Sequence, residues 1–536
     1  MLQDLEASGT PPALPLETAE DTAERPKLGL WDAVSIIVGI VIGAGIYETA
    51  PAVFANAGSP ALALGVWLLG GVLSLIGACC YAELASAYPR SGGDYVYLSR
   101  AFAPWVGFLF GWAQLVMLMT GSIGMMAYVF SDYAVVGAGL ERSFSAPLAA
   151  AAATALTVLN LASVTLSKSA QNILTMLKAA GLVAVIIAGV LWAESGAFVS
   201  DGGAGGAPPS FGLAMVLVLY TYGGWNDAAF VAREVRQRQK NLPRALLLGT
   251  SFITLIYLAV NAAFMAGLGF DDASASEAIA ADVLSRPLGA LGGVAMSALV
   301  MISALSAVNA LVFTGARVYS SLGADYSALS MLGRWHSRLR SPANALLAQL
   351  VITLALITLV GTRPGRSVID AMVRWTGGEP VSWAGHGGFD TLLRCTAPVF
   401  WAFFLLTSCA LFVLRVRDPK RERPFKVPLY PALPAVFSAT CLYMLHAAID
   451  YAGALAWIGL GPVLAGVPVY FISRRRPGRP APQNLGVSNE QNHDRHGLDR
   501  RGLPRERLQH QPRHWPGGDG RDRHHTGDAP DSRETN

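Results

Sequence analysis

Long apolar blocks of about 20 residues follow one another along the chain, separated by short polar segments. Within a block the apolar residues do not alternate with polar ones: residues 148–161 read LAAAAATALTVLNL. A helix of this length spans about 30 Å of hydrocarbon, whereas the strands of a membrane β-barrel alternate over about 10 residues. The pattern therefore predicts an all-α polytopic membrane protein.

The apolar blocks predict twelve transmembrane helices. Their approximate bounds are residues 31–55, 60–88, 104–133, 145–166, 171–194, 211–234, 244–269, 287–322, 342–362, 391–415, 428–449 and 453–473.

Two of the twelve blocks contain glycines at their centres. The first carries VIGAGIYETAP (Val41–Pro51) and the sixth carries LYTYGGWND (Leu219–Asp227). Where a membrane helix unwinds, its peptide groups must face water, protein or a ligand, because each unpaired group costs several kcal/mol in hydrocarbon. Two interruptions at matching positions favour a transporter binding site. Close packing of small residues between helices is the alternative explanation.

An amino acid is a suitable ligand for such a pair of interruptions. Its carboxylate accepts hydrogen bonds from the free amides at a half-helix N-terminus, and its ammonium group donates to the free carbonyls.

Composition agrees with a membrane protein. Of the 536 residues 53% are hydrophobic and only 14% are charged, whereas soluble domains carry about 25% charged residues. The net charge of +4 is no argument for nucleic-acid binding, since the basic residues fall in loops and tails. All five cysteines lie in apolar segments (Cys79, Cys80, Cys395, Cys409 and Cys441), which indicates buried thiols and neither a disulfide framework nor a metal site. We expect no cofactor.

Outside the apolar blocks the chain has two polar tails. Residues 1–30 have no signal-peptide pattern and predict a disordered leader, and residues 479–536 predict a disordered tail. Basic residues gather in one set of alternate loops, which places both termini in the cytoplasm of a plasma-membrane protein. Residues 31–475 form the membrane domain between the tails.

The sequence carries no signature of an enzyme. It contains no HExxH motif, no GxGxxG after a strand and no grouping of His and Asp within a span. Nothing in it resembles a channel selectivity filter. A transporter and an amino-acid sensor that does not transport would have the same binding residues, so both remain open.

Five stretches resemble one known family in register. They are VIGAGIYETAP, the segment Tyr81–Tyr97, the segment Tyr222–Pro243, the segment Ser306–Arg317 and the segment Arg423–Pro431. These stretches are similar to motifs of the amino acid–polyamine–organocation superfamily, in particular its L-type amino-acid transporters and their bacterial relatives. The resemblance covers approximately residues 28–475.

The resemblance implies the LeuT-type fold, with a five-plus-five inverted repeat and two appended helices. The first repeat would cover about 31–194, the second about 211–415, and helices 11 and 12 about 428–473. It implies a secondary active transporter that moves neutral L-amino acids by proton symport or exchange. A transporter of cationic amino acids or polyamines, or a sensor, is the alternative.

The resemblance also implies a substrate site. Gly43, Ala44 and Gly45 would offer amides to the substrate carboxylate, with Ile40, Val41 and Ile46 beside them. Tyr220 would cover the substrate as a gate, Gly223 and Gly224 would form the second interruption, and Asn226 would reach the substrate or order the unwound backbone.

Four charged residues complete the predicted machinery. Lys178 lies deep in the fifth block, where the resemblance places it in the position of a sodium ion. It carries a proton, locks two helices together or extends to the membrane surface. Glu48 faces the cavity, where it favours a cationic substrate or proton movement, or it is a structural partner. Glu83 and Glu234 form inner-gate ion pairs or are solvated.

Eukaryotic L-type relatives are linked to a heavy chain through a cysteine between helices three and four. Residues 134–146 of this chain contain no cysteine. We therefore expect no disulfide-linked heavy chain, and a protein that works alone or as a homodimer in the bilayer, with an amino acid as its substrate.

Overall fold

A computed structural model describes residues 28–473, except 44, 90–91, 194–197, 199–209, 277, 337–340, 376–380, 382 and 384–386, and except the side chains of 231–233. Ala44 and nearly all of both predicted disordered tails lie outside the described residues.

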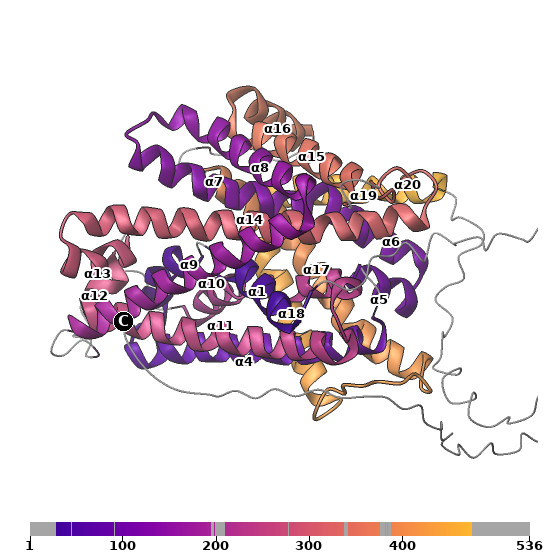
Figure 1. The fold of residues 1–536 in the computed structure, drawn as a ribbon, viewed down its shortest axis with the longest axis horizontal. Coiled ribbons are helices and arrows are strands. Elements are labelled where there is room, and N and C mark those ends of the chain that lie inside the picture. Colours follow the sequence, from indigo (N-terminus) through magenta and orange to yellow (C-terminus); the bar gives the residue numbers. More distant parts are fainter. Residues whose placement is uncertain are drawn as a thin grey trace, which may run out of the picture. The chain divides into compact units, whose positions relative to one another are not determined.

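The described part of the chain is helical and contains no β-strand (Figure 1). Ten of its helices are long and apolar enough to cross a membrane, and each coincides with a predicted span. Their elements are α4 (Pro60–Ala87), α6 with η1 and α7 (Pro104–Gly137), η2 with α8 (Arg142–Ala162), α9 (Val164–Leu191), α11 (Arg238–Leu268), α14 (Leu291–Asp325), α15 (Ala343–Gly361), α17 (Gly388–Arg417), α18 (Ala432–Ala452) and α19 with α20 (Leu455–Ile472).

The other two predicted spans are broken into shorter helices. The first is divided into α1 (Leu30–Val41), α2 (Gly45–Glu48) and α3 (Ala50–Ala57). The sixth is divided into α10 (Phe211–Thr221) and the 3₁₀ helix η3 (Trp225–Glu234). Both helices thus break at the glycines of the two unusual stretches.

Four short helices lie in connections that the apolar pattern left without structure. They are α5 (Asp94–Ala101), α12 (Phe270–Ala275), α13 (Ile279–Leu288) and α16 (Arg363–Trp375). They lack the continuous apolar run that marks a membrane span: α16 buries only Gly365, Ile369 and Val373. A search for apolar blocks therefore does not find them.

The broken helix α1 lies at the centre of the bundle, against α9, α11 and α14 (Figure 1). Helices α4 and α11 run side by side beneath it in this view. The approach of α11 to α1 needs a glycine, because a Cβ on Gly249 would lie 2.9 Å from the Ile37 side chain. This packing holds α1 where η3 contacts it.

Candidate functional site

The first interruption exposes carbonyl groups at the end of α1. The Ile42 N–H still donates to the Val38 carbonyl at 3.0 Å, but the Gly43 N–H turns back to the Val41 carbonyl at 2.8 Å. The carbonyl of Gly39, which a continuous helix would pair with the Gly43 N–H, is left without its usual partner. A donor from another helix has to replace it.

Lys178 of α9 supplies that donor. Its ammonium Nζ donates to the Gly39 carbonyl at 2.9 Å and to the Ile42 carbonyl. The side chain is 0% exposed, which contradicts the alternative that it extends to the membrane surface. Lys178 therefore joins α9 to the interruption, and its positive charge faces the carbonyl end of the α1 dipole.

The second interruption uses both predicted glycines. The Gly223 N–H donates to the Tyr220 carbonyl at 3.0 Å, and Gly224 has a φ of 105°. Few residues other than glycine adopt such a φ. The Asp227 N–H then donates to the Gly224 carbonyl at 3.2 Å, which starts η3 in a new direction.

The two interruptions contact each other. A Cβ on Gly224 would lie 2.5 Å from Cγ2 of Ile40, and a Cβ on Gly45 would lie 3.3 Å from Cγ2 of Thr221. The hydroxyl groups of Thr49 and Thr221 are 2.9 Å apart. The unwound segments therefore face one another within the bundle.

Tyr257 of α11 links the two interruptions, although nothing in the sequence marks it as a functional residue. Its hydroxyl lies 2.9 Å from the Val41 carbonyl and 3.3 Å from the Thr221 carbonyl. Its ring packs edge-on against Trp67 and Tyr222, with ring centres 5.6 and 5.1 Å away. A tyrosine within an apolar span is common in a core, so only the fold assigns this one to the site.

Beyond the first interruption, Glu48 is exposed. It lies close enough to Asp132 and Tyr133 of α7 and to Tyr220 of α10 to interact with them electrostatically. The half-buried Tyr220 points its hydroxyl toward Met125, with its oxygen 3.9 Å from the sulfur. Glu48 thus lies beside the predicted gate residue.

At the N-terminal end of α1, backbone hydrogen bonds and an ion pair hold the chain against η3 and α14. The Leu28 N–H donates to the Glu234 carbonyl at 2.8 Å, and the Arg236 N–H donates to the Leu28 carbonyl at 2.9 Å. Glu234 accepts from Arg317 of α14 at 2.7 Å. Glu234 therefore makes the ion pair that was predicted as one of its two alternatives.

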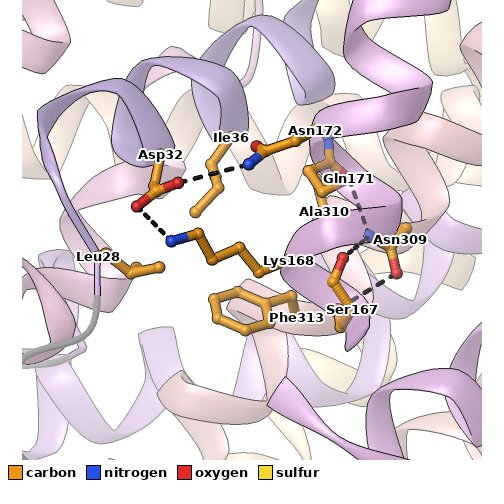
Figure 2. A pocket seen from close by; sticks show the side chains of 10 residues that line it. All are labelled: Leu28, Asp32, Ile36, Ser167, Lys168, Gln171, Asn172, Asn309, Ala310 and Phe313. Carbon is orange, nitrogen blue, oxygen red and sulfur yellow. Dashed lines mark hydrogen bonds and ion pairs between the residues drawn. The ribbon is translucent and has the colours of Figure 1, made fainter. Parts of the chain in front are cut away.

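A small hollow lies at the same end, between α1, α9 and α14 (Figure 2). Figure 2 shows Lys168 reaching Asp32 across it, with Nζ 2.7 Å from the carboxylate. Asn309 of α14 donates to Gln171 of α9 at 2.9 Å on its far wall. These contacts link α1, α9 and α14 on the Leu28 side of the interruptions.

Glu83 is 1% exposed and anchors the segment that follows α17. Its carboxylate accepts from Arg415 at 2.6 Å and from the backbone N–H of Val427 at 2.7 Å, and it lies 3.3 Å from Arg423. The alternative that Glu83 is a solvated helix-end charge is therefore wrong.

Asn226 is 2% exposed and lies just past the second interruption, where it interacts with the buried carboxylate of Asp94 of α5. Asp94 begins the short helix α5, and nothing in the apolar pattern of the sequence marks it as a functional residue.

The described residues thus contain ten membrane-length helices and two broken helices that contact each other at their unwound segments. This combination is characteristic of one class of membrane protein. Peptide groups freed inside a membrane domain and gathered from two helices are the architecture of secondary transporters.

Comparison with known proteins narrows this class. Residues 28–460 match the amino acid permease family. The human cystine/glutamate transporter is 28% identical over 456 residues, 84% of this chain and 85% of that protein. The human large neutral amino acids transporter small subunit 2 is 29% identical over 471 residues (84% and 81%), and the human b(0,+)-type amino acid transporter 1 is 30% identical over 436 residues (80% and 83%).

The chain belongs to the amino acid permease family. It is an integral membrane protein that transports amino acids, and it is not an enzyme. These findings confirm the family and the activity class predicted from the sequence.

Proposed function

We propose that this permease is a twelve-helix secondary active transporter of the five-plus-five inverted-repeat type, moving neutral L-amino acids by exchange or proton symport. The ten long helices and the two broken ones together supply twelve spans. Residues 31–475 form its membrane domain, and both termini lie in the cytoplasm, since the basic loops are on that side. We call the end of the membrane domain at which Leu28 lies the inner end.

The observation that carries this proposal is the contact between the two interruptions. The substrate carboxylate would accept hydrogen bonds from the N–H groups at Ala44 and Gly45, beside Ile40, Val41 and Ile46. The Gly43 N–H, which donates to the Val41 carbonyl here, would join them by leaving that carbonyl when substrate binds. Its ammonium would donate to the carbonyls near Gly223 and Gly224. Tyr220 would cover it from the outer side. Asn226 would act from behind the site, through Asp94.

Lys178 would act in this site as a fixed cation in the position of a sodium ion. It occupies two carbonyls that would otherwise be free to bind a metal ion. Coupling to sodium is disfavoured by this arrangement, because a second cation there would meet the ammonium charge at close range.

A cationic substrate is the second candidate, and Glu48 favours it. Its exposed carboxylate lies near Tyr220 and Tyr133, where an extended basic side chain would meet both negative charge and aromatic rings. A Glu48→Gln variant separates the two candidates: it would lose preference for L-arginine and L-lysine and keep L-leucine transport.

The experiment that tests the function is counterflow in proteoliposomes of the purified full-length chain. Vesicles loaded with unlabelled amino acid should accumulate radiolabelled L-leucine, and a panel of neutral, cationic and anionic amino acids should compete according to class. Binding of these amino acids without any flux would instead identify a sensor and overturn the transport proposal.

We propose further that the chain works without a disulfide-linked partner, alone or as a homodimer. Its five cysteines all lie in membrane-length helices, three of them buried and two half-buried. The name of one relative, a "small subunit", stands against this proposal, since that protein is part of an assembly. Size-exclusion chromatography with light scattering, with and without reductant, would decide it.

A further inference from the structure

A pair of buried carboxyl groups lies beyond the substrate site, where the start of α5 meets η3. There the Gly92 N–H donates to the Phe230 carbonyl at 3.2 Å, and a Cβ on Gly93 would lie 2.7 Å from the Phe230 ring. Asp94 begins α5 and is 1% exposed, and Asp227 lies on η3, three residues after Gly224, and is 7% exposed. Asp94 is the ionisable side chain with the largest electrostatic effect on the Asp227 carboxyl. The pair therefore joins a short helix to the inner half of the sixth span.

One oxygen of the Asp94 carboxylate accepts a hydrogen bond, from the Tyr81 hydroxyl of α4 at 2.5 Å. Thr407 of α17 and Asn226 of η3 lie close to the carboxylate, but its other oxygen has no hydrogen-bond partner among the described residues. Burial nevertheless raises the pKa of Asp94 to about 6, because the loss of water outweighs these donors.

Asp227 has no such support. Its backbone N–H donates to Gly224, but none of the described residues donates a hydrogen bond to its carboxyl group or forms an ion pair with it. A buried carboxylate without donors is costly, and a second negative charge nearby increases the cost. Such a pair ionises as a unit and keeps a proton while it remains buried.

Among the described residues, the charged and titratable groups around the pair do not neutralise it. Tyr97 of α5 and Tyr319 of α14 lie near Asp94 and Asp227 respectively, and a phenol is uncharged at neutral pH. Arg317 of α14 is paired with Glu234, and Arg415 of α17 is paired with Glu83.

We propose that the Asp94–Asp227 pair is a proton-binding site that controls the inner gate of this transporter. It holds one proton while η3 packs on α5, and it releases that proton to water when the inner end opens and hydrates both carboxyls. Only an O–H bond breaks or forms, and water accepts or supplies the proton. The proposal rests on the proposed function, because only alternating access requires the inner end to open.

The equilibrium between the closed and open inner end depends on pH because the two states bind different numbers of protons. Over the pH range in which both carboxyls are ionised in the open state, the closed state still binds one proton. Within that range each unit of pH increase therefore favours opening by up to about tenfold. Acidification should keep the inner end closed.

Labelling of a single cysteine at Leu28 tests this. Leu28 is 1% exposed and pairs through its backbone with Glu234 and Arg236, so it becomes accessible only when the inner end opens. In full-length Leu28→Cys protein without the five native cysteines, a membrane-impermeant maleimide added from the inner side should react several-fold faster at pH 8 than at pH 5.5, after correction for thiolate reactivity with a free-cysteine peptide.

The variants give distinct results. Asp227→Asn should flatten the pH profile, Asp227→Glu should keep it, and Asp94→Asn should move its midpoint to lower pH. The matched control is Asp325→Asn, which removes another buried carboxylate, one that accepts a 2.5 Å hydrogen bond from Tyr95 of α5, and should leave the profile unchanged. A pH profile in Asp227→Asn equal to that of the unaltered pair would overturn the proposal.

A second readout needs no introduced cysteine. The rate of L-leucine counterflow should fall on acidification in the native chain and fall less in Asp227→Asn; equal falls would count against the proposal. Because labelling needs no substrate, the tests fail separately: no counterflow of any amino acid would refute the proposed transport function, whereas a flat labelling profile would refute the proton site.

Discussion

At the scale of single residues, the site depends on side chains that complete the hydrogen bonding of broken helices. Lys178 does so for Gly39 and Ile42, and Tyr257 does so for Val41 and Thr221. A lysine at membrane depth is conspicuous in a sequence and was selected, whereas a tyrosine among many aromatic residues was not. The role of a tyrosine hydroxyl depends on which groups lie within hydrogen-bonding distance of it in the folded protein.

Replacing Lys178 by alanine should remove most transport. Two carbonyls lose charge-assisted hydrogen bonds worth about 1.5–3 kcal/mol each, so we expect at least a ~10-fold loss of L-leucine counterflow. Lys178→Met, which keeps an unbranched apolar side chain without the charge, should lose as much. Transport at the native rate in either variant would mean that Lys178 has no part in the site.

Tyr257→Phe should have a smaller effect. The variant keeps the ring and its packing but loses a hydrogen bond worth about 0.5–1.5 kcal/mol, which predicts a ~2–10-fold slower counterflow. Tyr222→Phe is the matched control, since its hydroxyl donates at 3.1 Å to the Trp67 carbonyl of α4 and not to a carbonyl of either interruption. Equal rates in the two variants would argue against a special role for Tyr257.

At the scale of elements, the span pattern was predictable and the short helices were not. Each continuous span coincides with a predicted block, because the thickness of a membrane fixes both helix length and apolar content. The breaks in α1 and α10 were also predicted, since glycine is the residue that leaves a helix most easily. Helix α5 was missed, although it carries Asp94.

Gly224→Ala tests the geometry of the second break. A φ of 105° disfavours alanine by about 1–3 kcal/mol, and the new Cβ would lie 2.5 Å from Ile40. We expect a lower melting temperature in detergent and strongly reduced counterflow. Gly293→Ala in α14, where an added Cβ meets nothing within 4 Å, should melt at the same or a higher temperature. Similar melting temperatures for the two variants would contradict this geometry.

At the scale of the whole membrane domain, the two sides of the interruptions differ. On the inner side Leu28 pairs with the end of η3, Lys168 holds Asp32, and Arg317 holds Glu234. On the other side Glu48 is exposed beside the half-buried Tyr220. The arrangement corresponds to a transporter closed at its inner end, as alternating access requires of one of its states.

Glu234→Gln should weaken this closure. The Arg317 guanidinium, whose side chain is 3% exposed, would lose its carboxylate partner, so the open state should become more populated. We expect maleimide labelling of Leu28→Cys from the inner side to become several-fold faster. Asp450→Asn, which breaks an exposed pair with His446 on α18, should leave labelling unchanged. Slower labelling in Glu234→Gln would contradict the gate role.

The sequence by itself determined the helical class, the positions of the spans, the two breaks and the family. Those properties follow from local chemistry: hydrocarbon selects apolar runs of a fixed length, and glycine marks where a run is interrupted. Only the tertiary structure shows that Tyr257 forms hydrogen bonds at both interruptions and that Arg317 forms an ion pair with Glu234. The tertiary structure also brings Asp94 close enough to Asp227 for the two carboxyls to interact. Each of these contacts joins residues from different helices, and which side chains meet depends on how the helices pack.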